Sequence, residues 1–221
     1  RFNISFVDSE HPDKYIRGMI PLPFCGIYDG NACYITDLTS TGKHFSSLFG
    51  YVNRGAVLKH IHMKDVLITG SGGFYSGALV GGIYDDGGNV LVEDCSVSGL
   101  KDGSSVSGSL IGRAYATGYT TASSVTIKNC YSDLTSGVMN GGLIGVADDY
   151  GDSKIFIVDC HAKVGGDVSA YSGLIGGVHL GEGTIEISRC SAVVSESTSC
   201  NSGMIYRVNA QSPGRLSIHD S

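Results

Sequence analysis

A four-residue pattern that returns about every 31 residues constrains this 221-residue chain more than any other feature. It consists of a small residue, a leucine-like residue, another apolar residue and usually glycine. The leucine-like positions are spaced by 31, 31, 33, 31 and 30 residues, and they are Leu48, Leu79, Leu110, Leu143, Leu174 and Met204. A fixed period of this length is typical of repeat architectures, in which each unit buries its apolar face against its neighbours.

A second pattern lies between the copies of the first and has the same period. It reads apolar-x-apolar-x-x-Cys, and degenerate copies ending at Ile61 and Ser221 flank four complete ones. From Ile61 the successive steps are 34, 35, 30, 30 and 31 residues, and the cysteines of the complete copies are Cys95, Cys130, Cys160 and Cys190. Two independent patterns therefore indicate one repeating unit.

The local pattern within each unit is that of β-strands. In Val125–Lys128 and Ile185–Ser188 apolar and polar residues alternate, so that one face of each strand is buried. Glycine, which supplies 33 of the 221 residues, separates such runs together with Asn, Asp and Ser, the residues that tolerate turns. Apolar spacing of three and four residues does not persist long enough for a helix.

These observations predict an all-β fold, a right-handed parallel β-helix (β-solenoid) with about six coils of about 31 residues. Equivalent residues of successive coils then form internal columns of leucines and of cysteines. A β-sandwich is the alternative, because it also has many short strands, but it does not require the same side chains at a fixed period. The solenoid is therefore favoured.

The repeated motif resembles a known family. The segment Gly141–Gly145, which follows Asn129–Tyr131, resembles the GLUG motif, and Pro23–Asn31 resembles the segment that commonly precedes such repeats. The similarity covers roughly residues 20–221. The motif departs from its usual glycines at Ala78, Ser109 and Tyr206.

GLUG repeats occur in large bacterial cell-surface and adhesin-like proteins and beside IgA-specific metallopeptidase modules. The resemblance therefore implies a bacterial, extracellular or cell-surface location. It supplies no catalytic residues that transfer to positions of this chain. The resemblance is specific for the repeat and says little about function.

The repeats divide the chain into two parts. Residues 1–35 are predicted to form an N-terminal lead-in with the first strands, and residues 36–221 the GLUG-like solenoid. The chain begins with Arg1 and ends on a cysteine-type position at Ser221, so we expect a fragment of a larger protein that continues into flanking domains.

Charge and composition argue against several partners. The net charge is −6, from 15 basic and 21 acidic residues without a basic cluster, so nucleic acid and anionic membranes are not expected partners. The apolar runs are too short to span a bilayer. No phosphate loop, metalloprotease motif or nucleophile elbow occurs, and no cofactor is expected.

Cysteine and histidine suggest metal sites, but the solenoid favours structural roles. A column directs the four repeated thiols in parallel, which suits neither tetrahedral metal coordination nor disulfides, so they are interpreted as core residues. Cys25 and Cys33 lie eight residues apart across a turn, and a disulfide between them stays an alternative. His60 and His62 are predicted to face solvent, because Ile61 and its alternating neighbours occupy the interior.

The candidate binding surface lies after the leucine positions, where the loops differ in length. The longest is Arg113–Ser124, and variable loops on one face of a repeat protein often bind ligands. Five residues after each leucine position the chain carries aromatic or polar residues, which predict a lateral column that contacts a glycan or a protein. The residues assigned to ligand binding are Tyr84, Tyr115, Asp148 and His179, between Asn53 and Asn209.

Two further possibilities involve carboxylates. The loops Tyr84–Asn89 and Asp148–Asp152 offer oxygen ligands for Ca²⁺, although exposed turns use the same residues. Asp94 and Asp159 precede repeated cysteines and would meet across coils in a carbohydrate-cleaving β-helix, but Asn129 and Arg189 occupy the same position.

The predicted function is a non-catalytic surface module for adhesion and spacing, with a lyase, a tailspike-type hydrolase or a peptidase accessory module as alternatives.

Overall fold

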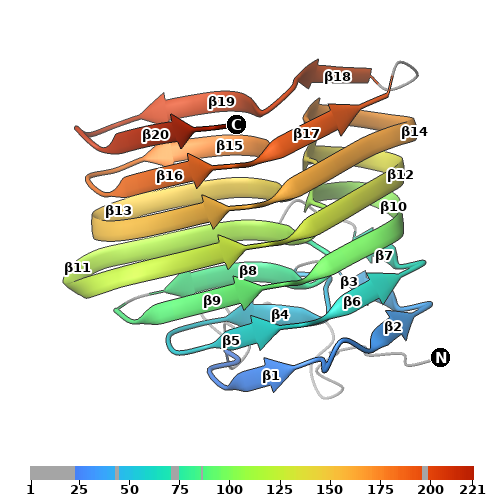
Figure 1. Ribbon diagram of the computed structural model, residues 1–221, viewed down its shortest axis with the longest axis horizontal. Helices are drawn as coiled ribbons and strands as arrows, with labels where there is room; N and C mark the ends of the chain where they lie inside the picture. Colours follow the sequence, from blue (N-terminus) through green and yellow to red (C-terminus); the bar gives the residue numbers. More distant parts are fainter. Residues whose placement is uncertain (1–22, 43–44, 71–74, 86, 196–198) are drawn as a thin grey trace, which may run out of the picture.

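The computed structural model describes residues 23–42, 45–70, 75–85, 87–195 and 199–221, and within them the chain forms two parallel β-sheets and no helix. Figure 1 shows the strands stacked from the first coil at one end to the last coil at the other. The coil is right-handed and makes about 5 turns of ~31 residues each. The predicted all-β parallel solenoid is confirmed.

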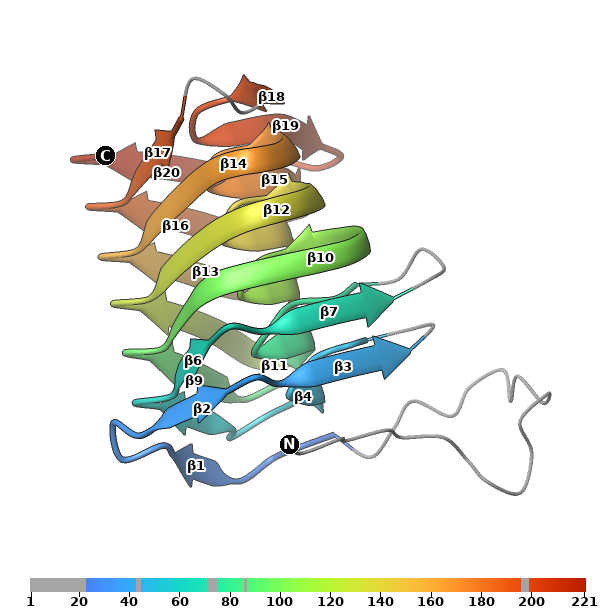
Figure 2. The same ribbon diagram turned by 90° about the vertical axis from the view of Figure 1, so that its right-hand side faces the viewer.

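Each turn of the coil contributes strands to both sheets. The first sheet contains β1 (Ile27–Asp29), β4 (Phe49–Val52), β5 (Val57–Lys59), β8 (Val80–Asp85), β9 (Asn89–Glu93), β11 (Ile111–Lys128), β13 (Ile144–Val158), β15 (Ile175–Leu180), β16 (Thr184–Ser188), β19 (Ile205–Ala210) and β20 (Arg215–His219). The second sheet contains β2 (Tyr34–Thr36), β3 (Thr39–Gly42), β6 (His62–Lys64), β7 (Leu67–Gly70), β10 (Ser96–Gly108), β12 (Tyr131–Gly141), β14 (His161–Ser172), β17 (Ser191–Val194) and β18 (Ser199–Ser202). The first sheet folds back on itself, so that β5, β9, β16 and β20 lie on one side of the coil and β4, β8, β15 and β19 on the other, and the second sheet closes the coil (Figures 1 and 2). Figure 2 shows the second sheet from its outer side.

Strand pairing places equivalent residues of successive coils directly above one another. Ile127 pairs with Val92 on one side and with Ile157 on the other, and Ile157 pairs with Ile187. All four side chains are fully buried, as the alternating pattern predicts. The apolar face of each strand is thus covered by the coils on either side of it.

The leucine positions form the second internal column. The amide N–H of Leu79 donates to the carbonyl of Leu110 at 3.1 Å, that of Leu110 to Leu143 at 3.0 Å, and that of Leu143 to Leu174 at 2.9 Å. These four leucines are fully buried. Leu48 and Met204, at the two ends of the column, are partly buried against the core.

The four repeated cysteines are buried and free. Backbone hydrogen bonds join the coils at this position, from the Tyr131 amide to the Cys95 carbonyl and from the His161 amide to the Cys130 carbonyl, at 3.0 and 2.9 Å. Burial raises the pKa of the Cys130 thiol well above its usual value, so the thiol stays protonated. Cys25 and Cys33 are exposed and also free.

A left-handed residue stands at the end of the first-sheet strand in each coil, just before each of the four repeated cysteines and before their equivalents Ile61 and Ser221. The φ angles there lie between 51° and 53°, at His60, Asp94, Asn129, Asp159, Arg189 and Asp220. Asp, Asn and His are the non-glycine residues found most often in this conformation, whereas Arg189 is unusual in it. These six residues are called the corner column below.

The variable segment and the lead-in are more regular than the sequence suggests. Residues 113–124, predicted as a loop, belong to β11, and the extra residues are accommodated by a register shift between Gly118 and Ser123. In the segment 1–35, β1 pairs in parallel with β5, and residues 1–22 lie outside the described residues.

We expect Leu143→Ala to destabilise the fold by about 2–5 kcal/mol, because it empties a fully buried site whose neighbours are held by the ladder. Urea unfolding of both proteins measures the difference. Met204→Ala, at the partly buried end of the same column, is the matched control and should lose less. Equal losses for the two variants would contradict the continuous leucine column.

Candidate functional site

The predicted lateral column exists as a row of paired residues on the outer face of the first sheet. Tyr84 pairs with Tyr115, Tyr115 with Asp148, Asp148 with His179, and His179 with Asn209. The row crosses β8, β11, β13, β15 and β19, which lie side by side in Figure 1. Residues on either side of each member point into the core, for example Ala114 and Ala116 beside Tyr115.

The centre of this row is an ionic cluster. The Asp148 carboxylate is fully buried; it accepts a hydrogen bond from Nε of Arg113 and lies 2.7 Å from Nδ1 of His179. Arg113 is 19% exposed and His179 is 37% exposed. Burial alone would lower the pKa of Arg113, but the neighbouring Asp148 carboxylate outweighs it and raises that pKa. Arg113 is therefore a permanent cation that compensates a buried carboxylate.

Tyrosine rings surround the Arg113 guanidinium. Its central carbon lies 4.7 Å from the ring centroids of both Tyr75 and Tyr115 and 5.5 Å from that of Tyr84. Arg113 Nη1 also donates to the Tyr84 hydroxyl at 3.2 Å. Such distances are those of cation–π contacts, which gain strength where water is excluded. Arg113 is thus held from several sides and has little freedom to move.

The aromatic contacts continue along the solenoid axis. The Tyr84 and Tyr115 centroids are 5.2 Å apart, Tyr51 and Tyr84 are stacked at 4.6 Å, and Tyr115 and Tyr150 are 5.4 Å apart. Gly82 makes room for this stack, because a Cβ there would lie 2.7 Å from the Tyr84 ring. Tyr51, Tyr84, Tyr115 and Tyr150 therefore form one continuous row of ring contacts, and His179 stands farther along the same face.

The structure places the four predicted residues in one column but gives them unequal access. Tyr84, Tyr115 and His179 are partly exposed, whereas Asp148 has no exposed surface and is not available for direct contact with a ligand. Asp148 instead holds Arg113 and lies in ion-pair distance of His179. Sequence reasoning missed Tyr75 and Arg113, since neither stands at a repeated position; the start of the longest variable segment at Arg113 was the only signal.

The acidic loops that suggested calcium bring one residue each, Asn89 and Asp152, to a common surface hollow, which holds a single carboxylate beside Lys154; Asp86 lies outside the described residues. Asp85 and Asp149 point inward and are fully buried, while Asp148 is compensated by Arg113. Burial raises the pKa of Asp149, and its carboxylate accepts a hydrogen bond from the Gly181 amide at 3.2 Å. Among the described residues no group of three or more His, Cys, Asp or Glu side chains is arranged to hold a metal ion.

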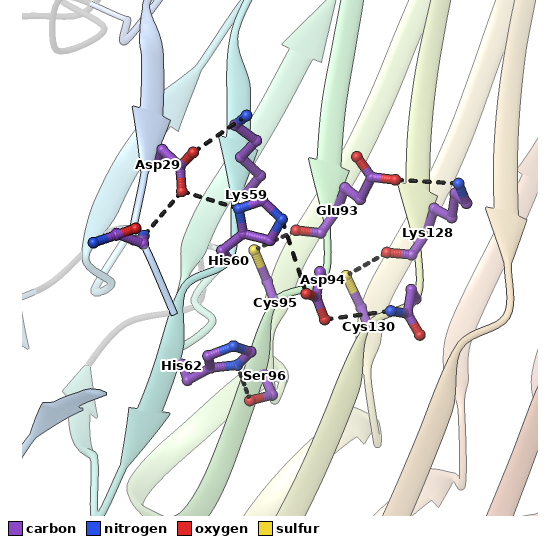
Figure 3. Close-up of polar contacts among 12 residues, drawn as sticks. Asp29, Lys59, His60, His62, Glu93, Asp94, Cys95, Ser96, Lys128 and Cys130 are labelled. Carbon is purple, nitrogen blue, oxygen red and sulfur yellow. Dashed lines mark hydrogen bonds and ion pairs between the residues drawn. The ribbon is translucent and has the colours of Figure 1, made fainter. Parts of the chain in front are cut away.

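Paired charges lie in and beside the corner column, where strands of the first sheet end, as Figure 3 shows for the first coils. Asp29 contacts Lys59 Nζ at 3.2 Å and His60 Nδ1 at 3.0 Å. The pKa of Asp29 is lowered to about 2, first by the hydrogen bond from the Asn31 amide and next by the one from His60. Asp159 binds Arg189 through two contacts of 2.6 and 2.8 Å, which lower the Asp159 pKa.

His60 and His62 face outward, as predicted. His60 contacts Asp29, and His62 Nδ1 lies 2.9 Å from the Ser96 hydroxyl. The two imidazoles therefore have different partners and do not converge on a common point. The side chains between and beside them, Ile61 and Met63, are buried.

Comparisons with known proteins add no relative: no family model, no curated protein and no solved structure matches this chain. Within the described residues, no helix is long and apolar enough to cross a bilayer.

Replacing Asp148 with Asn should destabilise the fold by about 3–5 kcal/mol, because it leaves the largely buried Arg113 charge without its partner. Chemical denaturation measures the loss. Glu93→Gln is the matched control, since its pair with Lys128 is exposed and should contribute less than about 1 kcal/mol. If both variants lose the same small amount, the buried cluster does not stabilise this face.

Proposed function

We propose that this chain is a non-catalytic module of a bacterial surface or secreted protein, which acts as a rigid spacer and binds a glycan or a host protein. The contact surface is the tyrosine–arginine face, defined as Tyr75, Tyr84, Arg113, Tyr115 and His179. The observation that carries the proposal is the in-register column on β8, β11, β13 and β15, braced by the buried Asp148.

Rigidity is the physical reason why this face suits binding. Arg113 contacts Tyr75, Tyr84 and Tyr115, and the ladder fixes the backbone beneath them. When a ligand binds to aromatic side chains that are already ordered, little conformational entropy of these side chains is lost, so little of the binding free energy is offset. The exposed edge of His179 adds a polar group for orientation.

Binding without turnover fits the charges on this face better than carbohydrate cleavage. A glycosidase mechanism needs two carboxyl groups facing the substrate. Here Asp148 is buried and compensated by Arg113, and the adjacent Asp149 points into the core. A shallow hollow elsewhere, lined by Asn89, Ala122, Ser123, Ser124, Asp152 and Lys154, contributes one carboxylate.

The surface location rests on the resemblance of the repeat to the GLUG motif. The segment Gly141–Gly145 and its equivalents support an extracellular setting, and the parallel solenoid supports a spacer role because hydrogen bonds brace each coil against the next. End-to-end continuation with flanking domains belongs to the same proposal.

A glycan and host-protein binding screen tests the proposal with the wild-type protein and the Tyr84→Ala/Tyr115→Ala double variant. We expect the double variant to weaken binding about tenfold or more, since it removes two adjacent contact rings. A Tyr171→Ala/Tyr206→Ala variant is the matched control, because these rings are also stacked, at 5.0 Å, but lie off the face.

A polysaccharide-cleavage assay runs beside the binding screen. Reproducible cleavage that a single Asp substitution abolishes would contradict the non-catalytic role. Binding that survives the Tyr84/Tyr115 substitutions at full strength would contradict the proposed face.

A further inference from the structure

A second outward row runs along the start of the second sheet and repeats the same three residue types twice. The first residues of β2, β6, β10, β12, β14 and β17 pair in direct succession. In chain order they read Tyr, His, Ser, Tyr, His, Ser, and we call them the tyrosine–histidine ribbon: Tyr34, His62, Ser96, Tyr131, His161 and Ser191.

The two triplets share their contacts as well as their order. His62 Nδ1 lies 2.9 Å from the Ser96 hydroxyl, and His161 Nδ1 lies 2.8 Å from the Ser191 hydroxyl. Figure 3 shows the first of these contacts beside the corner column. In both triplets the serine of the next coil occupies Nδ1, so Nε2 is the ring nitrogen that a ligand would meet.

The ribbon is accessible to a ligand. Tyr34 is 68% exposed and Tyr131 is 37% exposed, and His161 and Ser191 are exposed as well. Tyr34 packs obliquely against His62, with the ring centroids 5.7 Å apart. The next residue of each strand points inward, so the core is complete without these side chains and does not account for the tyrosines.

The ribbon carries hydroxyl, imidazole and phenol side chains, and ion pairs flank it on both sides. On one side lies the corner column, where Arg189 binds Asp159 at 2.6 Å. On the other side Lys163 contacts Asp133 at 3.4 Å. An aromatic centre with a polar rim is the usual composition of a specific interface. Paired rim charges favour an uncharged ligand over a nucleic acid or an anionic membrane.

We propose that the tyrosine–histidine ribbon is a binding site for a linear, neutral polysaccharide that lies parallel to the solenoid axis. Sugar rings stack on Tyr34 and Tyr131, while the hydroxyl groups of the sugars bond to Nε2 of His62 and His161. Adjacent strands are about 4.8 Å apart, so the six positions extend over about 24 Å and engage several sugar units at once. This site does not depend on the tyrosine–arginine face.

Isothermal titration calorimetry with defined oligosaccharides tests the proposal on the full chain. The probes are neutral hexasaccharides of the cello-, xylo-, malto- and N-acetylated chito- series, with the corresponding trisaccharides. Oligogalacturonate and a single-stranded dT oligomer serve as charged comparators. We expect at least one neutral hexasaccharide to bind with a Kd below about 1 mM and more tightly than its trisaccharide. Absence of such binding in all four series, or tighter binding of either charged probe, would overturn the proposal.

Substitutions locate the site. Tyr34→Ala/Tyr131→Ala should weaken the bound hexasaccharide about tenfold or more, since each ring supplies a stacking contact. Tyr171→Ala/Tyr206→Ala, outside both proposed surfaces, should leave its Kd unchanged, and Tyr84→Ala/Tyr115→Ala is measured beside them. Urea unfolding of each variant checks that the solenoid is intact.

The outcomes separate this site from the tyrosine–arginine face. If the Tyr34→Ala/Tyr131→Ala variant loses hexasaccharide binding and the Tyr84→Ala/Tyr115→Ala variant keeps it, the ribbon is supported, even when the screen finds no ligand for the tyrosine–arginine face. Unchanged binding in that variant, or loss only in the Tyr84/Tyr115 variant, would contradict the ribbon.

Discussion

Parallel hydrogen bonding between equivalent residues of successive coils is the constraint on which the rest of this molecule depends. Backbone hydrogen bonds at the leucine and cysteine positions join each coil to the next, so residues one period apart lie directly above one another. Identical apolar side chains then pack as columns, which keeps the core continuous through all coils. Loss of one coil would expose the apolar faces of both its neighbours.

The same constraint governs charge and surface chemistry. A column places side chains about 4.8 Å apart, so like charges in succession repel and opposite charges pair. Three ion pairs in and beside the corner column follow this rule: Asp29 with Lys59, Glu93 with Lys128, and Asp159 with Arg189. On the outer face the ladder also produces ordered rows of aromatic groups, from which both proposed binding surfaces arise.

Much of the fold could be predicted because the same residue types recur at the repeated positions. Leu110, Leu143 and Cys130 recur at fixed steps and are buried where their columns place them. The tyrosine–arginine cluster could not be predicted in full, because Tyr75 and Arg113 occupy positions without a repeated residue type. The direction of Asp148 toward Arg113 depends on tertiary packing.

Two other features could not be predicted from the sequence, because no single residue type recurs at their positions. Arg189 adopts the left-handed corner conformation because the coil geometry requires it, although arginine rarely does so. The tyrosine–histidine ribbon uses three residue types in turn, so a search for one recurring residue does not find it. Its order becomes visible once the strand register aligns the six positions.

Site-resolved amide hydrogen exchange tests the coil-to-coil ladder most directly. The amides of Leu110 and Leu143, whose hydrogen bonds cross between central coils, should exchange only through global unfolding. Their opening free energies should equal that from urea denaturation and exceed that of Ile205, near the end of the stack. Exchange of Leu110 and Leu143 that is as fast as exchange of Ile205 would contradict a cooperative column of mutually supported coils.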